Sequence, residues 1–90
     1  MEAKKVCVIT GAAGVLPSAF ATEMVKNGYA VALLDRNAAG AEALAARIRA
    51  EGGTAAAYPC DVLDKASLQA AHEKMRAELG PATVLINGAG

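Results

Sequence analysis

The chain has 90 residues, with nine acidic and nine basic side chains and 54% hydrophobic residues. These values describe one small, apolar, charge-balanced domain, so they exclude a disordered chain and a protein that binds nucleic acid through a basic surface. Alanine accounts for 23 residues, whereas Val, Ile, Leu, Met and Phe together account for 22. Because alanine contributes little apolar area, we expect a thin core and either marginal stability, self-association or membership of something larger.

The two cysteines and the start of the chain predict a location. Cys7 and Cys60 have no CxxC spacing and no Cys/His cluster around them, so we expect free thiols in a reducing compartment and no metal site. The apolar run at 6–9 is too short for a signal peptide, and no run approaches the ~18 apolar residues of a membrane span. We therefore expect a cytoplasmic protein with no membrane partner.

The first half of the chain predicts a strand, a helix and a second strand. Residues 5–10 form a short β-branched run that ends at a glycine, which is typical of a strand buried on both faces. Residues 16–27 predict a helix that ends at Gly28 and has its apolar stripe on Leu16, Ala19, Phe20 and Met24. Residues 30–35 form a second apolar run, and we expect another buried strand there.

The second half predicts two further helices and two further strands. An alanine-rich helix is expected at 38–51, followed by a strand at 54–60 although alanine and Pro59 are poor strand residues. Asp64 is the expected N-cap of a helix at 65–78, and residues 83–87 are expected to form the fourth strand. The alternation of apolar strands with helices predicts an α/β fold with a Rossmann-like, doubly wound parallel sheet, whose fourth strand pairs with the first and is left as an edge.

The first turn between strand and helix has the composition of a phosphate-binding loop. Gly11 and Gly14 stand among alanines directly before a predicted helix, whose unpaired N–H groups attract anions. Asp35 ends the second strand near the ~20-residue spacing at which an acidic residue reaches the adenosine ribose in dinucleotide-binding units. Its charge favours NAD over NADP, whereas the neighbouring Arg36 would favour a 2′-phosphate. The alternatives are a tight turn without a ligand and a polar strand end facing water.

Two further strand ends are expected at the same edge of the sheet. Asp61 and Val62 follow the third strand. There Asp61 would accept a hydrogen bond from the adenine amino group, and Val62 would cover the ring. Asn87, Gly88 and Ala89 follow the fourth strand, and their small side chains would let a nucleotide pass close to the backbone. The alternatives are a turn aspartate that caps nearby backbone and a flexible terminus.

These features together resemble the short-chain dehydrogenase/reductase family. The resemblance covers 6–90 and rests on TGAAGVLP at 10–17, LLD at 33–35, CDV at 60–62 and INGAG at 86–90. It implies that Gly11 and the backbone around Val15 and Leu16 hold the pyrophosphate, Asp35 the ribose, Asp61 and Val62 the adenine, and that Asn87 and Ala89 line the nucleotide. Within the family, the chain is most similar to sugar-acid oxidoreductases of the mannonate oxidoreductase (fructuronate reductase) type.

The chain departs from the family pattern at three places. The family signature is TGxxxGxG, but here Val15 stands at its second glycine, with Gly14 one place earlier, and Pro17 stands at its third. Gly88 replaces the second asparagine of the family's NNAG motif. Proline suits a first helical turn, although its ring adds bulk where close approach is expected.

The family's catalytic Tyr-x-x-x-Lys pair is absent from these 90 residues, because Leu33 and Val62 stand four places after Tyr29 and Tyr58. We therefore expect one nucleotide-binding unit over 1–90, cut before the catalytic half and without turnover of its own. The parent protein would transfer hydride between NAD, or less favourably NADP, and an alcohol or carbonyl substrate such as a sugar acid or polyol. The alternative is a non-catalytic half-Rossmann module that binds a nucleotide or only folds.

Overall fold

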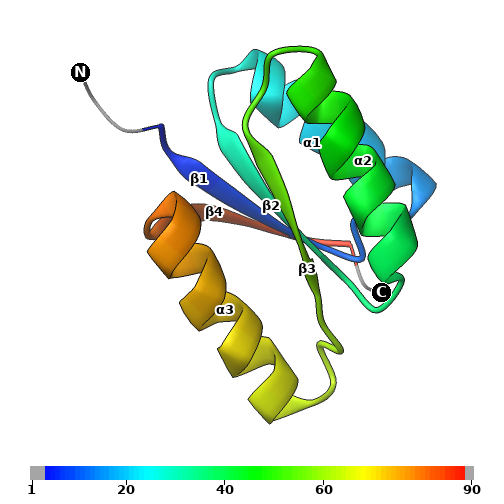
Figure 1. Ribbon diagram of the computed structural model, residues 1–90, viewed down its shortest axis with the longest axis vertical. Coiled ribbons are helices and arrows are strands. Elements are labelled where there is room, and N and C mark those ends of the chain that lie inside the picture. The colour runs from blue at the N-terminus through cyan, green and yellow to red at the C-terminus, as the bar shows by residue number, and fades with distance from the viewer. Residues whose placement is uncertain (1–3, 89–90) are drawn as a thin grey trace.

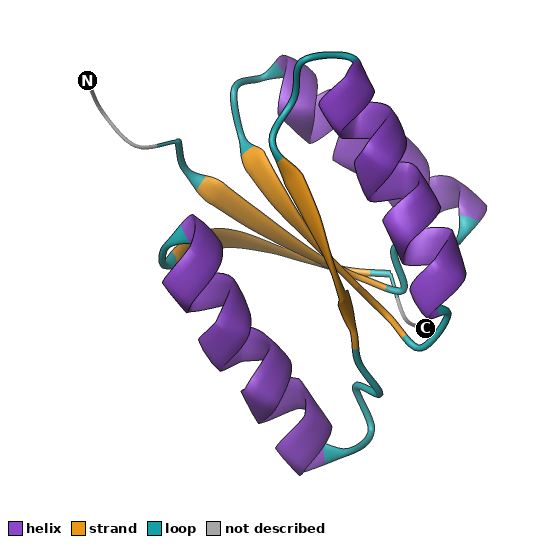
Figure 2. Ribbon diagram, viewed as in Figure 1, coloured by secondary structure: helices purple, strands orange, loops and turns teal. Residues whose placement is uncertain are grey.

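A computed structural model describes residues 4–88 as four strands and three helices in strict alternation. The strands are β1 (Val6–Thr10), β2 (Ala30–Asp35), β3 (Ala55–Pro59) and β4 (Ala82–Asn87), and the helices are α1 (Val15–Lys26), α2 (Ala38–Ala50) and α3 (Lys65–Leu79). Each observed boundary lies within about two residues of the predicted one, as is usual for helix ends. Figure 1 shows the chain in sequence colours, and Figure 2 separates helices from strands.

The four strands form one parallel sheet in the order β3-β2-β1-β4. Helices α1 and α2 cover one face of the sheet and α3 covers the other (Figure 1). This arrangement confirms the Rossmann-like parallel sheet predicted from the sequence. Thr10 pairs in register with Leu34 on one side and Asn87 on the other, so the ends of three strands lie side by side.

The core consists of two layers, one on each face of the sheet. One layer joins α1 and α2 to the sheet through residues such as Ile9, Leu33 and Ile48, and the other joins α3 to it through Val8, Leu34 and similar residues. Every residue of β1 and five of the six residues of β2 are buried, as the continuous apolar runs predicted. Alanines provide much of the buried helix surface, namely Ala21, Ala41, Ala45 and Ala71. The small side chains let each helix lie close to the sheet.

Three of the four residues predicted to form the apolar stripe of α1 are exposed, whereas the fourth, Met24, is half-buried against the core. Leu16 and Phe20 are 71% and 50% exposed, and Ala19 is also exposed, whereas Ala21 is the helix's fully buried residue. The reason is that α1 carries apolar residues on more than one face, so the 3.6-residue period does not identify the buried face. The face that packs on the sheet is the one that carries Ala21, with Met24 and Val25 beside it.

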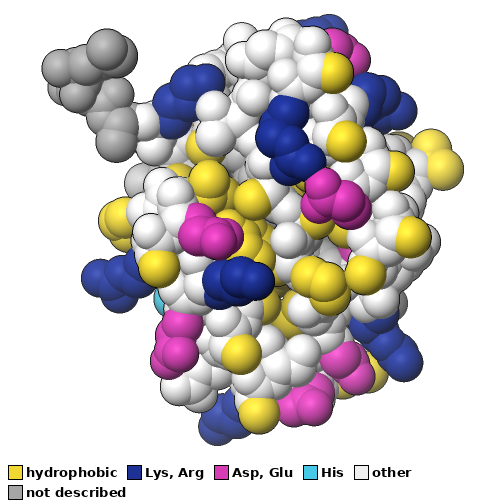
Figure 3. Space-filling view, viewed as in Figure 1, with side chains coloured by type: hydrophobic (Ala, Val, Ile, Leu, Met, Phe, Trp, Pro, Cys, Tyr) yellow, Lys and Arg dark blue, Asp and Glu magenta, His cyan; other side chains and the backbone are white. Residues whose placement is uncertain are grey.

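Strand β4 is the exposed edge that the strand order predicted. Its residues are exposed or half-buried. The Leu85 side chain lies on the same face of the sheet as α3 but is 67% exposed. On the face that Figure 3 shows, basic and acidic side chains are interspersed rather than segregated, in keeping with the balanced charge. Among residues 4–88, no helix combines the length and the apolar character needed to cross a bilayer.

Candidate functional site

The turn between β1 and α1 leaves the start of the helix open to solvent. Gly11 adopts a φ of 63°, a left-handed conformation that suits glycine, and the Gly14 N–H then donates to the Gly11 carbonyl at 3.0 Å. Gly14 is the N-cap of α1, and no side chain caps the helix. The first N–H groups of a helix lack partners within it. Because Pro17 has no N–H, those of Val15 and Leu16 are the donors that the first turn can offer to an anion.

The carboxylate of Asp35 ties this turn to the end of β2. Its Oδ2 accepts the Ala13 N–H at 2.9 Å, and its Oδ1 accepts the Asn37 N–H at 2.7 Å. The Ala12 N–H donates to the Leu34 carbonyl at 3.3 Å and strengthens the same link. Asp35 therefore positions the turn in addition to presenting a negative charge beside it.

A second set of hydrogen bonds holds the end of β4 against the end of β1. The Thr10 hydroxyl donates to Oδ1 of Asn87 at 2.9 Å, and the Gly88 N–H donates to the Thr10 carbonyl at 3.0 Å. Pro17, at the start of α1, lies directly against Gly88. The glycine-rich turn and the end of β4 thus meet at the carboxyl edge of the sheet, where ligands bind in folds of this kind.

Asp61 and Val62 follow β3 at the same edge. Asp61 Oδ1 accepts the Leu63 N–H at 3.0 Å, and the Asp61 N–H donates to the Ser67 hydroxyl at 3.1 Å. Asp61 thus makes the backbone-capping turn that was the alternative to a base contact, while its Oδ2 makes no hydrogen bond within residues 4–88. A role toward adenine stays a prediction.

A largely apolar hollow of about 720 Å³ extends down from this edge between α3 and the strands β1 and β4. Val62 and Asn87 both line it, so two of the predicted strand ends open into one space. Asp35 is on the other side of the sheet edge with the glycine-rich turn, because successive strand residues point to opposite faces. The candidate site therefore spans the sheet edge, with a polar part over β2 and an apolar part over β4.

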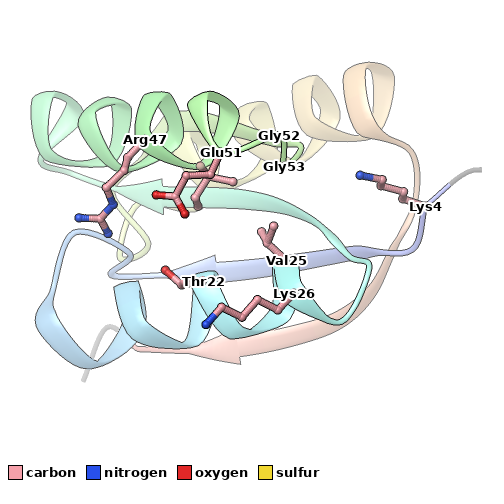
Figure 4. A pocket seen from close by; sticks show the side chains of 9 residues that line it. Lys4, Thr22, Val25, Lys26, Arg47, Glu51, Gly52 and Gly53 are labelled. Atoms are coloured by element: carbon pink, nitrogen blue, oxygen red, sulfur yellow. The ribbon is translucent and has the colours of Figure 1, made fainter.

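A smaller hollow of about 390 Å³ lies between α1 and α2 (Figure 4). Lys26 and Arg47 line it, and both belong to the last turn of a helix, where a positive charge stabilises the negative end of the helix dipole. Glycines 52 and 53 and Lys4 place it near the amino ends of the strands. We do not assign a ligand to this hollow, because its charges have a structural explanation.

The phenol of Tyr58 is already paired with a carboxylate of α3. Tyr58 is buried and donates from its hydroxyl to Glu78 at 2.7 Å, and burial and this carboxylate raise the pKa of the phenol far above its ordinary value. Its hydroxyl therefore stays protonated and paired with α3. No group of three or more metal-binding side chains gathers within residues 4–88.

Sequence reasoning located the strand ends but missed the contacts between them. The structure places Gly11, Gly14, Asp35, Asn87 and Gly88 around one turn. Arg36 is exposed beside it, and Ala89 lies outside the described residues. The roles of Thr10, Ala13 and Asn37 were missed. The register of parallel strands could have indicated the pairing of Thr10 with Asn87, whereas a hydrogen bond to the Ala13 backbone leaves no signal in the side chains.

Comparison with known proteins agrees with this geometry. A family model described as short chain dehydrogenase matches residues 5–90. An uncharacterised oxidoreductase of Bacillus subtilis, UxuB, is 48% identical over 88 residues, which cover 98% of this chain and 32% of that protein. D-Threitol dehydrogenase of Mycolicibacterium smegmatis is 43% identical over 86 residues, which cover 96% of this chain and 33% of that protein. The chain thus spans about a third of the length of these relatives.

Solved structures of oxidoreductases also superimpose on this chain. The crystal structure of a proposed D-mannonate oxidoreductase from Haemophilus influenzae with bound NAD superimposes with a TM-score of 0.94 at 36% identity, over 98% of this chain and 31% of that one. A metagenomic short-chain oxidoreductase in complex with NADP has a TM-score of 0.89 at 31% identity, over 98% of this chain and 40% of that one. Both kinds of nicotinamide dinucleotide therefore occur among the structural neighbours.

Proposed function

Since the chain belongs to the short chain dehydrogenase family, we propose that it is the dinucleotide-binding part of an NAD-dependent oxidoreductase. The observation that carries the proposal is the glycine-rich turn held by Asp35, with an uncapped helix start beside it. The pyrophosphate would sit on the N–H groups of Val15 and Leu16, and the ribose on Asp35. The bound dinucleotide supplies the hydride chemistry, while these residues bind and orient it.

The hydrogen bonds that Asp35 already makes support binding of NAD rather than NADP. A carboxylate offers about four lone-pair positions, and backbone N–H groups of Ala13 and Asn37 occupy two of them. The remaining positions suffice for the two ribose hydroxyls of NAD, whereas the phosphate of NADP would face a carboxylate held in place. Arg36, exposed at the end of the same strand, is the group that would favour NADP.

Parallel titrations with the two reduced cofactors test the cofactor assignment. NADH and NADPH are titrated into the natural full-length protein, and binding is followed by nicotinamide fluorescence. We expect tighter binding of NADH, and we expect Arg36→Ala to weaken NADPH binding while leaving the NADH affinity unchanged. Preferential binding of NADPH by the natural protein would refute the role given to Asp35.

The substrate class that we propose is a sugar acid or polyol, oxidised at a secondary alcohol or reduced at a carbonyl. The support comes from similarity to the D-threitol dehydrogenase and to the proposed D-mannonate oxidoreductase. The test is a panel of polyols and sugar acids, assayed with NAD at 340 nm on the full-length protein. Turnover of simple aliphatic or steroid alcohols, with none of the panel, would reject this class.

A non-catalytic nucleotide-binding or structural module is the second candidate. It is favoured by the absence of a Tyr-x-x-x-Lys pair from the 90 residues. The gene sequence beyond the codon for Gly90 distinguishes the two, because the oxidoreductase requires that pair downstream. We also propose a reducing, cytoplasmic location, supported by the two free and buried cysteines.

A further inference from the structure

Two departures from the family pattern, Pro17 and Gly88, contact each other in the structure. They lie far apart in the sequence, one at the start of α1 and the other after β4. The space where a Cβ of residue 88 would stand is filled by Cγ of Pro17, with Cβ of Pro17 at 2.9 Å and the Thr10 carbonyl oxygen at 2.7 Å. A side chain at position 88 therefore collides with a rigid ring on one side and with backbone on the other.

We propose that Pro17 and Gly88 are a matched pair of positioning residues that sets the distance between the glycine-rich turn and the end of β4. The proline ring fills the volume that a side chain at position 88 would need, and the missing side chain lets β4 reach the Thr10 carbonyl. Gly88 donates its N–H to that carbonyl at 3.0 Å, so the close approach is also hydrogen-bonded. A side chain at position 88 therefore requires a smaller residue at position 17.

The pair matters for binding because each member belongs to one wall of the proposed site. Pro17 is in the first turn of α1, directly after the backbone of Val15 and Leu16, and Gly88 directly follows Asn87. A Cβ at position 88 would move the end of β4 away from Thr10 or rotate the start of α1. Either movement separates the turn from the end of β4 and misdirects the N–H groups of the turn. This inference rests on the proposed function, although the contact itself does not.

A double-mutant cycle tests the pair in the natural full-length protein. The cycle comprises wild type, Pro17→Gly, Gly88→Ala and the double variant, each measured for thermal unfolding midpoint and NADH affinity. We expect Gly88→Ala alone to lower the midpoint by several degrees and to weaken NADH binding about tenfold, the range that overpacking produces. Pro17→Gly in the same chain is expected to restore part of both losses, because it removes the contact with the proline ring but leaves the contact with the Thr10 carbonyl oxygen.

A matched control uses the other glycine that faces this proline. A Cβ at Gly14 would meet Cδ of Pro17 at 3.4 Å and the Gly11 carbonyl oxygen at 3.3 Å, which is tight but without overlap. Gly14→Ala is therefore expected to lower the unfolding midpoint only by the small cost of an alanine at the N-cap, and to add independently to Pro17→Gly. Coupling of Gly14→Ala as strong as that of Gly88→Ala would show a general response to proline removal and overturn the pairing.

The outcomes separate the pair from the function on which it rests. Additive midpoints for Pro17→Gly and Gly88→Ala, or loss of folding in both Gly88 variants, would overturn the pairing, since the collision would then lie with Thr10 alone. Coupled unfolding midpoints with unchanged NADH affinity would overturn the role of the pair in dinucleotide binding. If the unfolding midpoints are coupled but the wild-type protein binds no dinucleotide, the contact is supported and the proposed function is rejected.

Discussion

Replacing Asp35 by asparagine separates the two roles of this carboxylate, because the amide has nearly the same shape but only one acceptor oxygen. In the protein, Oδ2 accepts the half-buried Ala13 N–H and Oδ1 accepts the exposed Asn37 N–H. An asparagine can satisfy one of these donors, and its NH₂ group then faces the other. We expect the oxygen to remain with Ala13, because leaving a half-buried donor unpaired costs more than leaving an exposed one.

The expected loss of stability follows from these contacts. One charge-assisted hydrogen bond, worth about 1.5–3 kcal/mol at full strength, is lost, and the other becomes neutral. Because water reaches the Asn37 N–H, we expect Asp35→Asn to lower the free energy of unfolding by about 1–2 kcal/mol. Asp35→Ala, which removes both acceptors, is expected to cost more.

Urea denaturation at pH 7, followed by circular dichroism, measures this loss. The control is Asp61→Asn, since Asp61 accepts the exposed Leu63 N–H through one oxygen, and asparagine retains that acceptor. We expect the control to change the free energy of unfolding by less than about 0.5 kcal/mol. Equal stability of Asp35→Asn, Asp61→Asn and wild type would refute the inference that Asp35 holds the turn.

Three further predictions concern the fold that supports the turn. Asp64→Ala removes the N-cap that accepts from two backbone N–H groups of α3, and it is expected to cost about 1 kcal/mol in urea denaturation. Gly11→Ala places a Cβ at a φ of 63° and is expected to cost about 1 kcal/mol or more in the same assay. Burial raises the pKa of Cys7, and burial with a neighbouring carboxylate raises that of Tyr58, so the unfolded chain loses these protons first and stability falls as pH rises above about 8.5. Urea midpoints between pH 7 and pH 11 check this fall, and a flat profile would contradict it.

Strands β1 and β2 were predictable because their burial on both faces requires apolar residue types. A parallel strand that is covered on both faces reads as a nearly continuous apolar run. Residues 6–10 and 30–34 form such runs, and both are buried. The N-cap Asp64 and the helix end at Gly28, with a φ of 89°, were predictable for a similarly local reason. Local patterns therefore gave the elements, and the parallel connection rules then gave their order.

The buried face of α1 was not predictable from such patterns, because the helix is apolar on several sides. Its orientation depends on where the helix backbone meets the sheet, which buries Ala21 and leaves Phe20 half exposed. The contact between Pro17 and Gly88 is of the same kind, since it depends on where two distant backbones meet. Non-local distances of this sort appear in a sequence only as unexplained departures from a family pattern.

The same geometry explains why the carboxyl edge has a defined shape. Neighbouring strands hold the turn from both sides, through Asp35 of β2 and through Gly88, whose N–H binds the Thr10 carbonyl of β1. These contacts require β1 to lie between β2 and β4, which is the order observed. A preorganised turn loses little conformational freedom when an anion binds, so the strand order itself contributes to affinity. Changes that loosen either link should therefore weaken dinucleotide binding even where the changed side chain does not touch the ligand.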